Sequence, residues 1–211
     1  MPLSGLTVIT GENGSGKSNL YRALRLLADA SNDRLIASLA REGGLASTLW
    51  AGPERFSRAM LRGEQPVQGT RRSSAISLAL GFQADDFGYA LDCGLPTSAA
   101  SAFALDPETK PACTWAGPLM RPASLLVDRR GPGVRVRGDD SRELRTLPQA
   151  VLSSDSVISH AIDPRESPEA LTLRERMRGW RFYDQLRSDR DSPARQPRIG
   201  TRTVALAADG G

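Results

Sequence analysis

The pattern of apolar residues near the start of the chain changes its period at a glycine-rich break. Residues 6–10 read LTVIT, a short apolar and β-branched run that predicts a buried strand. After the break, Leu20, Leu24 and Leu27 recur at positions i, i+4 and i+7, which is the spacing of one helix face. The opening of the chain therefore predicts a strand, a tight loop and a helix.

A second, shorter helix is expected at residues 34–41, where apolar residues again recur with helical spacing. Polar residues that favour helix N-termini precede it, and two glycines that favour helix ends follow it. The residues that mark it are Leu35, Ile36 and Leu39 for the spacing, Ser31 or Asn32 for the cap, and Gly43 and Gly44 for the end.

Further along, the apolar period falls to two, the period of a strand with one buried face. Residues 75–92 alternate on both sides of the polar segment QADD, which predicts an antiparallel hairpin. A second hairpin is predicted at residues 123–138, where the turn sequence GPG separates two apolar runs. The alternating positions are Ile76, Leu78, Leu80, Phe82, Phe87, Tyr89 and Leu91 in the first hairpin, and Val134 and Val136 in the second.

The remaining chain adds connections and one more helix. The proline-rich stretch 96–122 predicts ordered connections, and residues 168–187 predict a helix capped by Ser167. Leu173, Met177 and Trp180 lie on one face of that helix. The fold class predicted from these elements is α/β, with antiparallel hairpins following the first helix instead of the alternating strands and helices of kinase-like cores.

The glycine-rich break is a complete phosphate-binding loop. Residues Gly11 to Ser18 read GENGSGKS, which matches the pattern GxxxxGK[ST] in the strand-to-helix context that the motif requires. Its glycines let successive backbone N–H groups turn towards phosphate oxygens, and the helix N-terminus adds the positive end of its dipole. Lys17 is predicted to contact the β- and γ-phosphates, and the Ser18 hydroxyl to coordinate Mg²⁺. The predicted nucleotide-binding residues are Gly11, Asn13, Gly14, Ser15, Gly16, Lys17, Ser18 and Asn19.

The rarity of lysine strengthens this assignment. The chain has 28 basic residues, of which only Lys17 and Lys110 are lysines. A lysine at the one position where the motif demands it is therefore improbable by chance.

Composition narrows the class of protein. The chain has 211 residues, 39% of them hydrophobic, which is enough for one domain or two small ones with a core. No stretch is apolar enough to span a bilayer, and no signal-peptide pattern opens the chain. Cys93 and Cys113 lack metal-ligand spacing, so we expect reduced thiols and a cytoplasmic location. The single histidine, His160, argues against a histidine-rich metal site or a Ser/His/Asp triad.

The net charge of +4 permits contact with nucleic acid without demonstrating it. The basic stretch at residues 129–137 has acidic residues on both sides and no interleaved aromatic residues. We interpret it as a solvated face of mixed charge rather than a DNA site.

The run LTVITGENGSGKSNLYRALRLL, residues 6–27, resembles the opening of the SMC/RecF-like branch of ABC ATPases, in which Asn13 and Asn19 are usual. Segments such as REGGLASTLWAG, FGYALDCGLP and GWRFYDQLR resemble a bacterial group of predicted ATPases with an AAA-type or RecF-like domain. The resemblance covers essentially the whole chain. It implies the N-terminal lobe of an ABC-type ATPase head at residues 1–150 and a helical region at residues 151–211.

The resemblance also implies a function and its cofactors. ATP and Mg²⁺ would bind the loop, and hydrolysis would occur only when two heads of a homodimer enclose two nucleotides. DNA repair or other chromosome-related work is the implied process, with DNA as an open partner and no membrane contact.

Two parts of a complete head are not found in the chain: an LSGG-like signature and a Walker B strand ending in Asp-Glu. We therefore expect part of a head, which binds ATP without turning it over. Gln149 is the candidate for the glutamine loop that contacts Mg²⁺ in such heads, with His160 as the alternative. Two other functions stay open: a non-catalytic interaction module, and a small P-loop kinase in which Asp128, at the end of LLVD, holds the metal. Antiparallel hairpins after the loop favour a head or a module, whereas βαβ crossovers favour the kinase.

Overall fold

A computed structural model describes residues 1–48, 53, 55–67, 77–96, 105–138, 143–160, 163, 165, 167–184 and 186–197. The chain divides into two compact units, Met1–Arg178 and Gly179–Gly211, and each is described by itself. The lobe boundary predicted at residue 150 stays a prediction.

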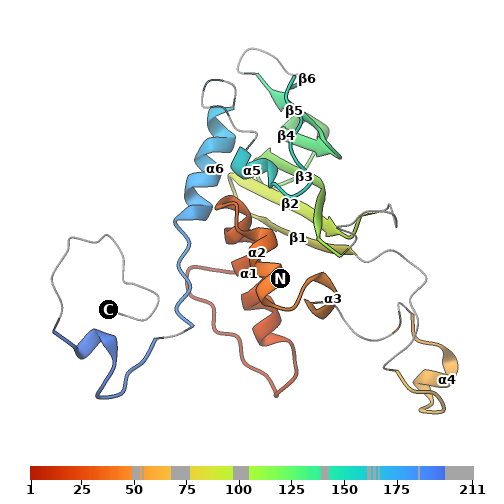
Figure 1. Ribbon diagram of the computed structural model, residues 1–211, viewed down its shortest axis with the longest axis vertical. Coiled ribbons are helices and arrows are strands. Elements are labelled where there is room, and N and C mark those ends of the chain that lie inside the picture. The colour runs from red at the N-terminus through yellow and green to blue at the C-terminus, as the bar shows by residue number, and fades with distance from the viewer. Residues whose placement is uncertain are drawn as a thin grey trace. The chain divides into compact units, whose positions relative to one another are not determined.

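A six-stranded sheet forms the centre of the first unit (Figure 1). Neighbouring strands follow one another in sequence order, and every pair is antiparallel. Both predicted hairpins are therefore confirmed over the residues that the structure describes, which exclude residues 75 and 76. The strands are β1 Ser77–Gln83, β2 Phe87–Gly94, β3 Glu108–Ala116, β4 Leu125–Arg130, β5 Gly133–Arg137 and β6 Leu144–Thr146.

The proline-rich stretch at residues 96–122, predicted to form connections, contains the strand β3. β3 includes Pro111, a residue that normally argues against a central strand. The register explains it: Leu91 pairs with Ala112 and Cys93 with Thr109, so two β3 residues oppose one β2 residue. Pro111 lies in this bulge, where its missing N–H costs no ladder hydrogen bond.

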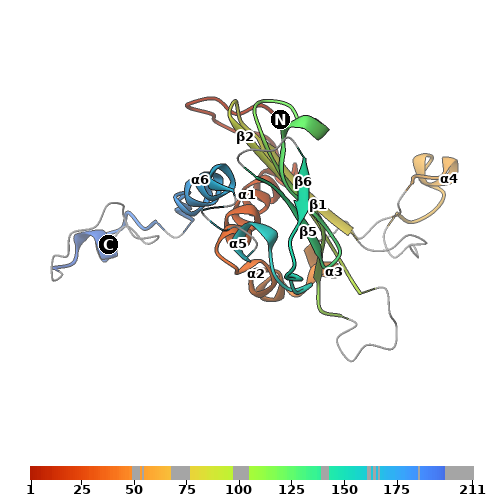
Figure 2. The same ribbon diagram turned by 90° about the horizontal axis from the view of Figure 1, so that it is seen from above.

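Four helices of the first unit, α1, α2, α5 and α6, pack on one face of the sheet (Figure 2). The side chains on that face form buried rows, one of which runs from Tyr89 through Thr114 and Val127 to Val136. The Tyr89 hydroxyl lies 3.0 Å from the hydroxyl of Ser156, at the start of α5. The helices are α1 Lys17–Ser31, α2 Leu35–Arg41, α3 Leu45–Thr48, α4 Arg58–Leu61, α5 Val157–His160 and α6 Pro168–Arg178.

The first two helices match the prediction, apart from one cap. α1 follows the loop directly, and its second half, from Leu26 to Ser31, is buried. α2 ends before Gly43 and Gly44, whose positive φ angles and hydrogen bonds to the last turn close the helix as expected. The predicted cap is wrong, because Ser31 belongs to α1 and the residue before α2 is Arg34, without a side-chain cap.

The strand predicted at residues 6–10 is absent from the described structure. Leu6, Val8 and Ile9 are 85%, 78% and 42% exposed, and none of the described strands pairs with this segment. Extended chain becomes a strand only when a neighbour accepts and donates its backbone hydrogen bonds. An apolar and β-branched run is thus insufficient without that neighbour.

The last helix is shorter than predicted. α6 ends at Arg178, because Gly179 follows and favours the end of a helix, so Trp180 lies outside it. Ser167 occupies the cap position through its backbone, since its carbonyl accepts from the Leu171 N–H at 3.1 Å. The predicted side-chain cap is wrong, because the buried Ser167 hydroxyl has no hydrogen-bond partner among the described residues. The second unit contains the 3₁₀ turn Pro193–Arg195 and an Arg187–Asp189 ion pair of 2.8 Å.

Candidate nucleotide-binding site

The phosphate-binding loop has the backbone conformation that its glycines allow. Gly14 and Gly16 have φ angles of 81° and 91°, a left-handed region that side chains other than glycine rarely adopt. Gly16 is the cap residue of α1, and a hydrogen bond of 3.2 Å from the Ser15 N–H to the Glu12 carbonyl closes the preceding turn. The loop therefore turns sharply into the helix.

Lys17 is held inside this turn by the loop backbone. Its ammonium donates hydrogen bonds of 2.7 Å to the carbonyls of Gly11 and Glu12, and it lies 3.4 Å from the Ser15 hydroxyl. Glu12 was missing from the predicted site residues. No sequence signal would have found it, because the contact uses its backbone carbonyl, which every residue type carries.

The start of α1 has unpaired donors. Asn19 and Leu20 donate to the Gly16 carbonyl at 3.0 and 3.2 Å. The N–H groups of Lys17 and Ser18 have no acceptor within the helix, because the residues that would accept from them lie before its start. The first turn contains no acidic side chain. These donors, the helix dipole and the lysine ammonium together favour an anion at this point.

The predicted loop residues are thus brought together in one open turn. Lys17 is half-buried, while the residues around it, including Asn13, Ser18 and Asn19, are exposed. Within the described residues the Ser18 hydroxyl makes no hydrogen bond, so it is available to a ligand.

Two further predicted metal ligands lie elsewhere in the sequence and differ in their surroundings. Gln149 is exposed in a bend after β6, and its role stays a prediction. Asp128 is buried on β4 and pairs with two guanidinium groups, Arg135 across the β4–β5 hairpin and Arg130 at 3.4 Å. The arginines satisfy this carboxylate structurally, which argues against a role for Asp128 in holding Mg²⁺.

The basic stretch at residues 129–137 is built into the sheet rather than forming a wholly solvated face. Arg129 is only 1% exposed and donates to the carbonyls of Gly131 and Leu152, each at 2.8 Å, and of Asp155. Burial lowers the pKa of Arg129, and the three carbonyls offset part of the cost of burying its charge. Arg137 donates to the carbonyls of Pro122 and Ala123.

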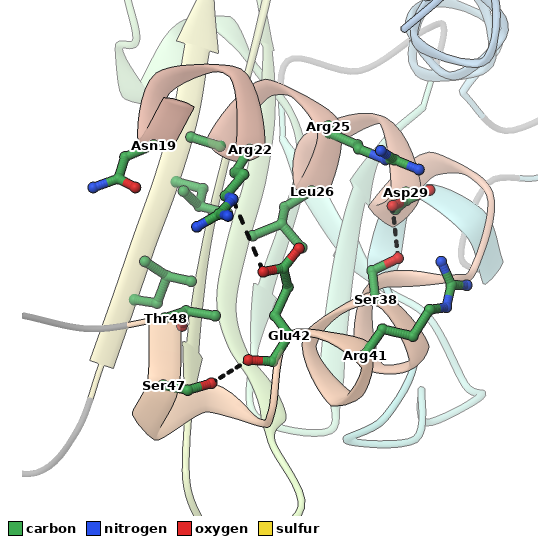
Figure 3. A pocket seen from close by; sticks show the side chains of 13 residues that line it. Asn19, Arg22, Arg25, Leu26, Asp29, Ser38, Arg41, Glu42, Ser47 and Thr48 are labelled. Carbon is green, nitrogen blue, oxygen red and sulfur yellow. Dashed lines mark hydrogen bonds and ion pairs between the residues drawn. The ribbon is translucent and has the colours of Figure 1, made fainter. Parts of the chain in front are cut away.

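A cavity of about 500 Å³ lies along α1, beginning at Asn19 (Figure 3). Its acidic groups have partners from the protein itself: Ser38 donates to Asp29 at 2.6 Å, and Arg22 lies 3.9 Å from Glu42. We assign no ligand to the cavity on these contacts. It is lined by Asn19, Arg22, Ala23, Arg25, Leu26, Asp29, Ser38, Arg41, Glu42, Ser47, Thr48, Leu78 and Leu80.

A GxxxxGKS loop with left-handed glycines, placed directly on the N-terminus of a helix, defines the class of P-loop nucleotide-binding proteins. Residues 6–210 match the family described as "AAA domain, putative AbiEii toxin, Type IV TA system". The chain belongs to this family, whose AAA-type domain supports nucleotide binding and an ATPase-type function. No curated protein and no solved structure matched the chain.

Across the part of the chain that the structure describes, none of the helices combines the length and apolar character needed to cross a membrane.

Proposed function

We propose that the chain binds ATP with Mg²⁺ on residues 11–19, as the N-terminal lobe of an SMC/RecF-like ATPase head. The observation that carries this proposal is the loop itself, which holds the Lys17 ammonium on its carbonyls and leads directly into the N-terminus of α1. Phosphate oxygens would replace the Gly11 and Glu12 carbonyls as acceptors for Lys17. A charged acceptor makes a stronger hydrogen bond with an ammonium than a neutral carbonyl does.

The proposal includes a Mg²⁺ ion bound together with the nucleotide. Ser18 directly follows Lys17 and has an exposed hydroxyl, which is the position that reaches Mg²⁺ in loops of this type. The bound ion would neutralise charge on the phosphates while the Ser18 oxygen orients it.

The fold supports a head over the kinase alternative. The described strands form one antiparallel meander, and no βαβ crossover occurs among the described elements. Asp128, which the kinase would need as its metal ligand, is occupied by arginines. We propose that a second copy of the head completes the site, with chromosome-related DNA work as the process in which the head takes part.

The test of nucleotide binding uses the two lysines of the chain. Lys17→Ala should weaken binding of Mg²⁺-ATP at least about tenfold, because it removes a charge-assisted contact to the phosphates. Lys110→Ala is the matched control, since Lys110 lies in β3 and its side chain makes no hydrogen bond or ion pair among the described residues. Calorimetric titration of each variant with ATP measures the difference.

Equal affinity of wild type and Lys17→Ala would overturn the assignment. Repeating the titration with EDTA and with Ser18→Ala tests the metal. Chelation should weaken binding to the wild type more than to Ser18→Ala, and equal losses would contradict the role of Ser18.

A further inference from the structure

The chain's only histidine lies between two carboxylates that are distant in sequence. His160 ends α5, Asp33 follows α1, and Asp155 precedes α5. The ring Nδ1 is 3.4 Å from Asp33 Oδ1, and the ring Nε2 is 3.8 Å from Asp155 Oδ2. One ligand atom from each of the three side chains lies within 4.8 Å of the others.

The donor set is one that divalent transition metals accept. Zinc takes imidazole nitrogen and carboxylate oxygen at about 2.0–2.2 Å, so tetrahedral ligands are about 3.4 Å apart. The observed separations exceed this spacing by 1.4 Å at most, a difference that side-chain rotation can close. Three protein ligands leave the fourth position of a tetrahedral site to water.

The charges at the cluster independently favour a cation. Neither carboxylate forms an ion pair with any arginine or lysine among the described residues, although the chain has 28 of them. The nearby arginines form their close contacts with other groups: Arg34 lies 3.4 Å from Asp29, and Arg129 donates to the backbone carbonyl of Asp155. The charge of Arg129 also acts on the Asp155 carboxylate, but from beyond ion-pair distance. Among the described residues, the only side-chain hydrogen-bond donors to these carboxylates are the hydroxyls of Ser159 and Ser154, at 3.4 and 3.0 Å. The Ser159 hydroxyl also lies 2.9 Å from His160 Nδ1, so a bound ion would replace that contact.

The cluster is also accessible. The side chains of Asp33 and His160 are 48% and 43% exposed, so an ion can enter from solvent, while that of Asp155 is 20% exposed. The site is therefore open to solvent and includes one less exposed carboxylate.

We propose that Asp33, Asp155 and His160 form a binding site for a divalent transition-metal ion of the zinc class. The ion joins the end of α1 to the segment that leads into α5, and thereby stabilises the packing of the P-loop helix against it. α1 has 15 residues, which places the cluster about 22 Å along the helix from the phosphate-binding loop. The metal site is thus separate from the proposed Mg²⁺-nucleotide site.

The single imidazole makes the test specific. In a ¹⁵N-labelled sample of the whole chain, the imidazole signals of long-range ¹H–¹⁵N spectra come from His160 alone. Titration with Zn²⁺ should shift one ring nitrogen saturably at one equivalent and raise the melting temperature, and EDTA should reverse both changes. Thiols cannot mimic this signal, because the observed nucleus is in the ring.

Variants distinguish a site from general metal binding. Asp33→Asn and Asp155→Asn should each weaken the Zn²⁺ titration at least about tenfold, since each removes a charged ligand. Asp85→Asn is the matched control, because Asp85 is exposed in the β1–β2 turn and makes no contact with the cluster. Lys17→Ala should leave the Zn²⁺ response unchanged, which separates this site from the nucleotide site.

The proposal is overturned if the ring signals do not move with Zn²⁺, or if Asp33→Asn and Asp85→Asn respond alike. Asp33 is half-exposed, so its variant remains informative even if Asp155→Asn fails to fold. Circular dichroism of each variant without metal establishes folding before titration.

Discussion

At the scale of single residues, the phosphate-binding loop holds its own lysine in place. The carbonyls of Gly11 and Glu12 hold the Lys17 ammonium at 2.7 Å before any ligand arrives. The side chain therefore loses little conformational freedom when phosphate oxygens replace these acceptors, and such preorganisation favours binding. The left-handed glycines fix the backbone around it.

Gly16→Ala should weaken ATP binding about tenfold. At a φ of 91°, an added Cβ strains the backbone and moves the N–H groups at the start of α1. Nothing lies within 4 Å of that Cβ, so backbone conformation is the cause rather than a clash. Gly5→Ala is the control, because Gly5 has equally open surroundings without a positive φ. Calorimetry with ATP compares them, and equal affinities would show that the loop does not need this conformation.

Cys93 should resist alkylation in the folded protein. Burial raises the pKa of the Cys93 thiol from 9.0 to about 12, so almost no thiolate is present at neutral pH. Burial also raises the pKa of Cys113, which is only half-buried. In a Cys113→Ala variant, iodoacetamide should modify Cys93 only in denaturing urea, as mass spectrometry would detect. Rapid modification of the native variant would contradict the buried position.

The same raised pKa makes the fold sensitive to alkali. The unfolded Cys93 thiol loses its proton near pH 9.0 while the folded one keeps it to about pH 12, so stability from this group is lost across that window. Burial also raises the pKa of Tyr89, which acts in the same direction. Cys93→Ala should therefore lose less stability than the wild type as pH rises from 9 to 12 in urea titrations. Equal losses of unfolding free energy in the wild type and Cys93→Ala over this pH range would contradict the prediction.

At the scale of elements, the β2–β3 pair depends on a close approach of glycine and tryptophan. Gly88 lies opposite Trp115, and a Cβ on Gly88 would come within 2.1 Å of the Trp115 ring. Trp115 is 5% exposed, so the ring has little space into which to move.

Gly88→Ala should lower the free energy of unfolding by about 2–3 kcal/mol, the upper part of the range for overpacked cores. Gly133→Ala is the control within the same sheet, since its Cβ would meet only the Arg130 carbonyl at 3.7 Å, an ordinary contact. Urea unfolding followed by circular dichroism measures both variants. Similar midpoints for the two would show that Trp115 moves aside readily.

The pattern of the sequence predicted correctly those helices and hairpins that are determined by residues near one another in the chain. The two hairpins followed from alternation and turn residues, α1 from helical spacing, and α2 from helical spacing with a glycine stop. β3 was missed because Pro111 is tolerated only through a bulge, and the bulge depends on pairing with β2. The segment 6–10 was misassigned for the opposite reason, since its composition suits a strand but no described strand pairs with it.

The same distinction between nearby and distant residues applies to the candidate sites. The phosphate-binding loop was predictable because its geometry comes from one continuous motif. The burial of Arg129 and the cluster around His160 were not, because their partners are far along the chain: Ser159 and Asp33 are 126 positions apart. Single-sequence spacing carries no information about such contacts.

At the scale of the whole molecule, α1 connects the phosphate-binding loop to the core of the first unit. The helix begins at the loop and its second half is buried among the other helices on one face of the sheet (Figure 2). The proposed metal site fastens the far end of the same helix. A ligand bound at either end would therefore contact the same helix.

The chain by itself should bind ATP but hydrolyse it negligibly. Positioning and charge stabilisation supply nearly all the catalysis of phosphoryl transfer, and the sequence contains no LSGG-like signature or Asp-Glu strand end to position water. Among the described residues, Lys17 and Ser18 contact no carboxylate, and Asp128 is held by arginines. A steady-state phosphate-release assay should therefore give the same low rate for wild type and Lys17→Ala, the variant that controls for contaminating ATPases. Robust turnover that depends on Lys17 would mean that the chain supplies its own catalytic carboxylate, and would remove the need for the second head that we propose.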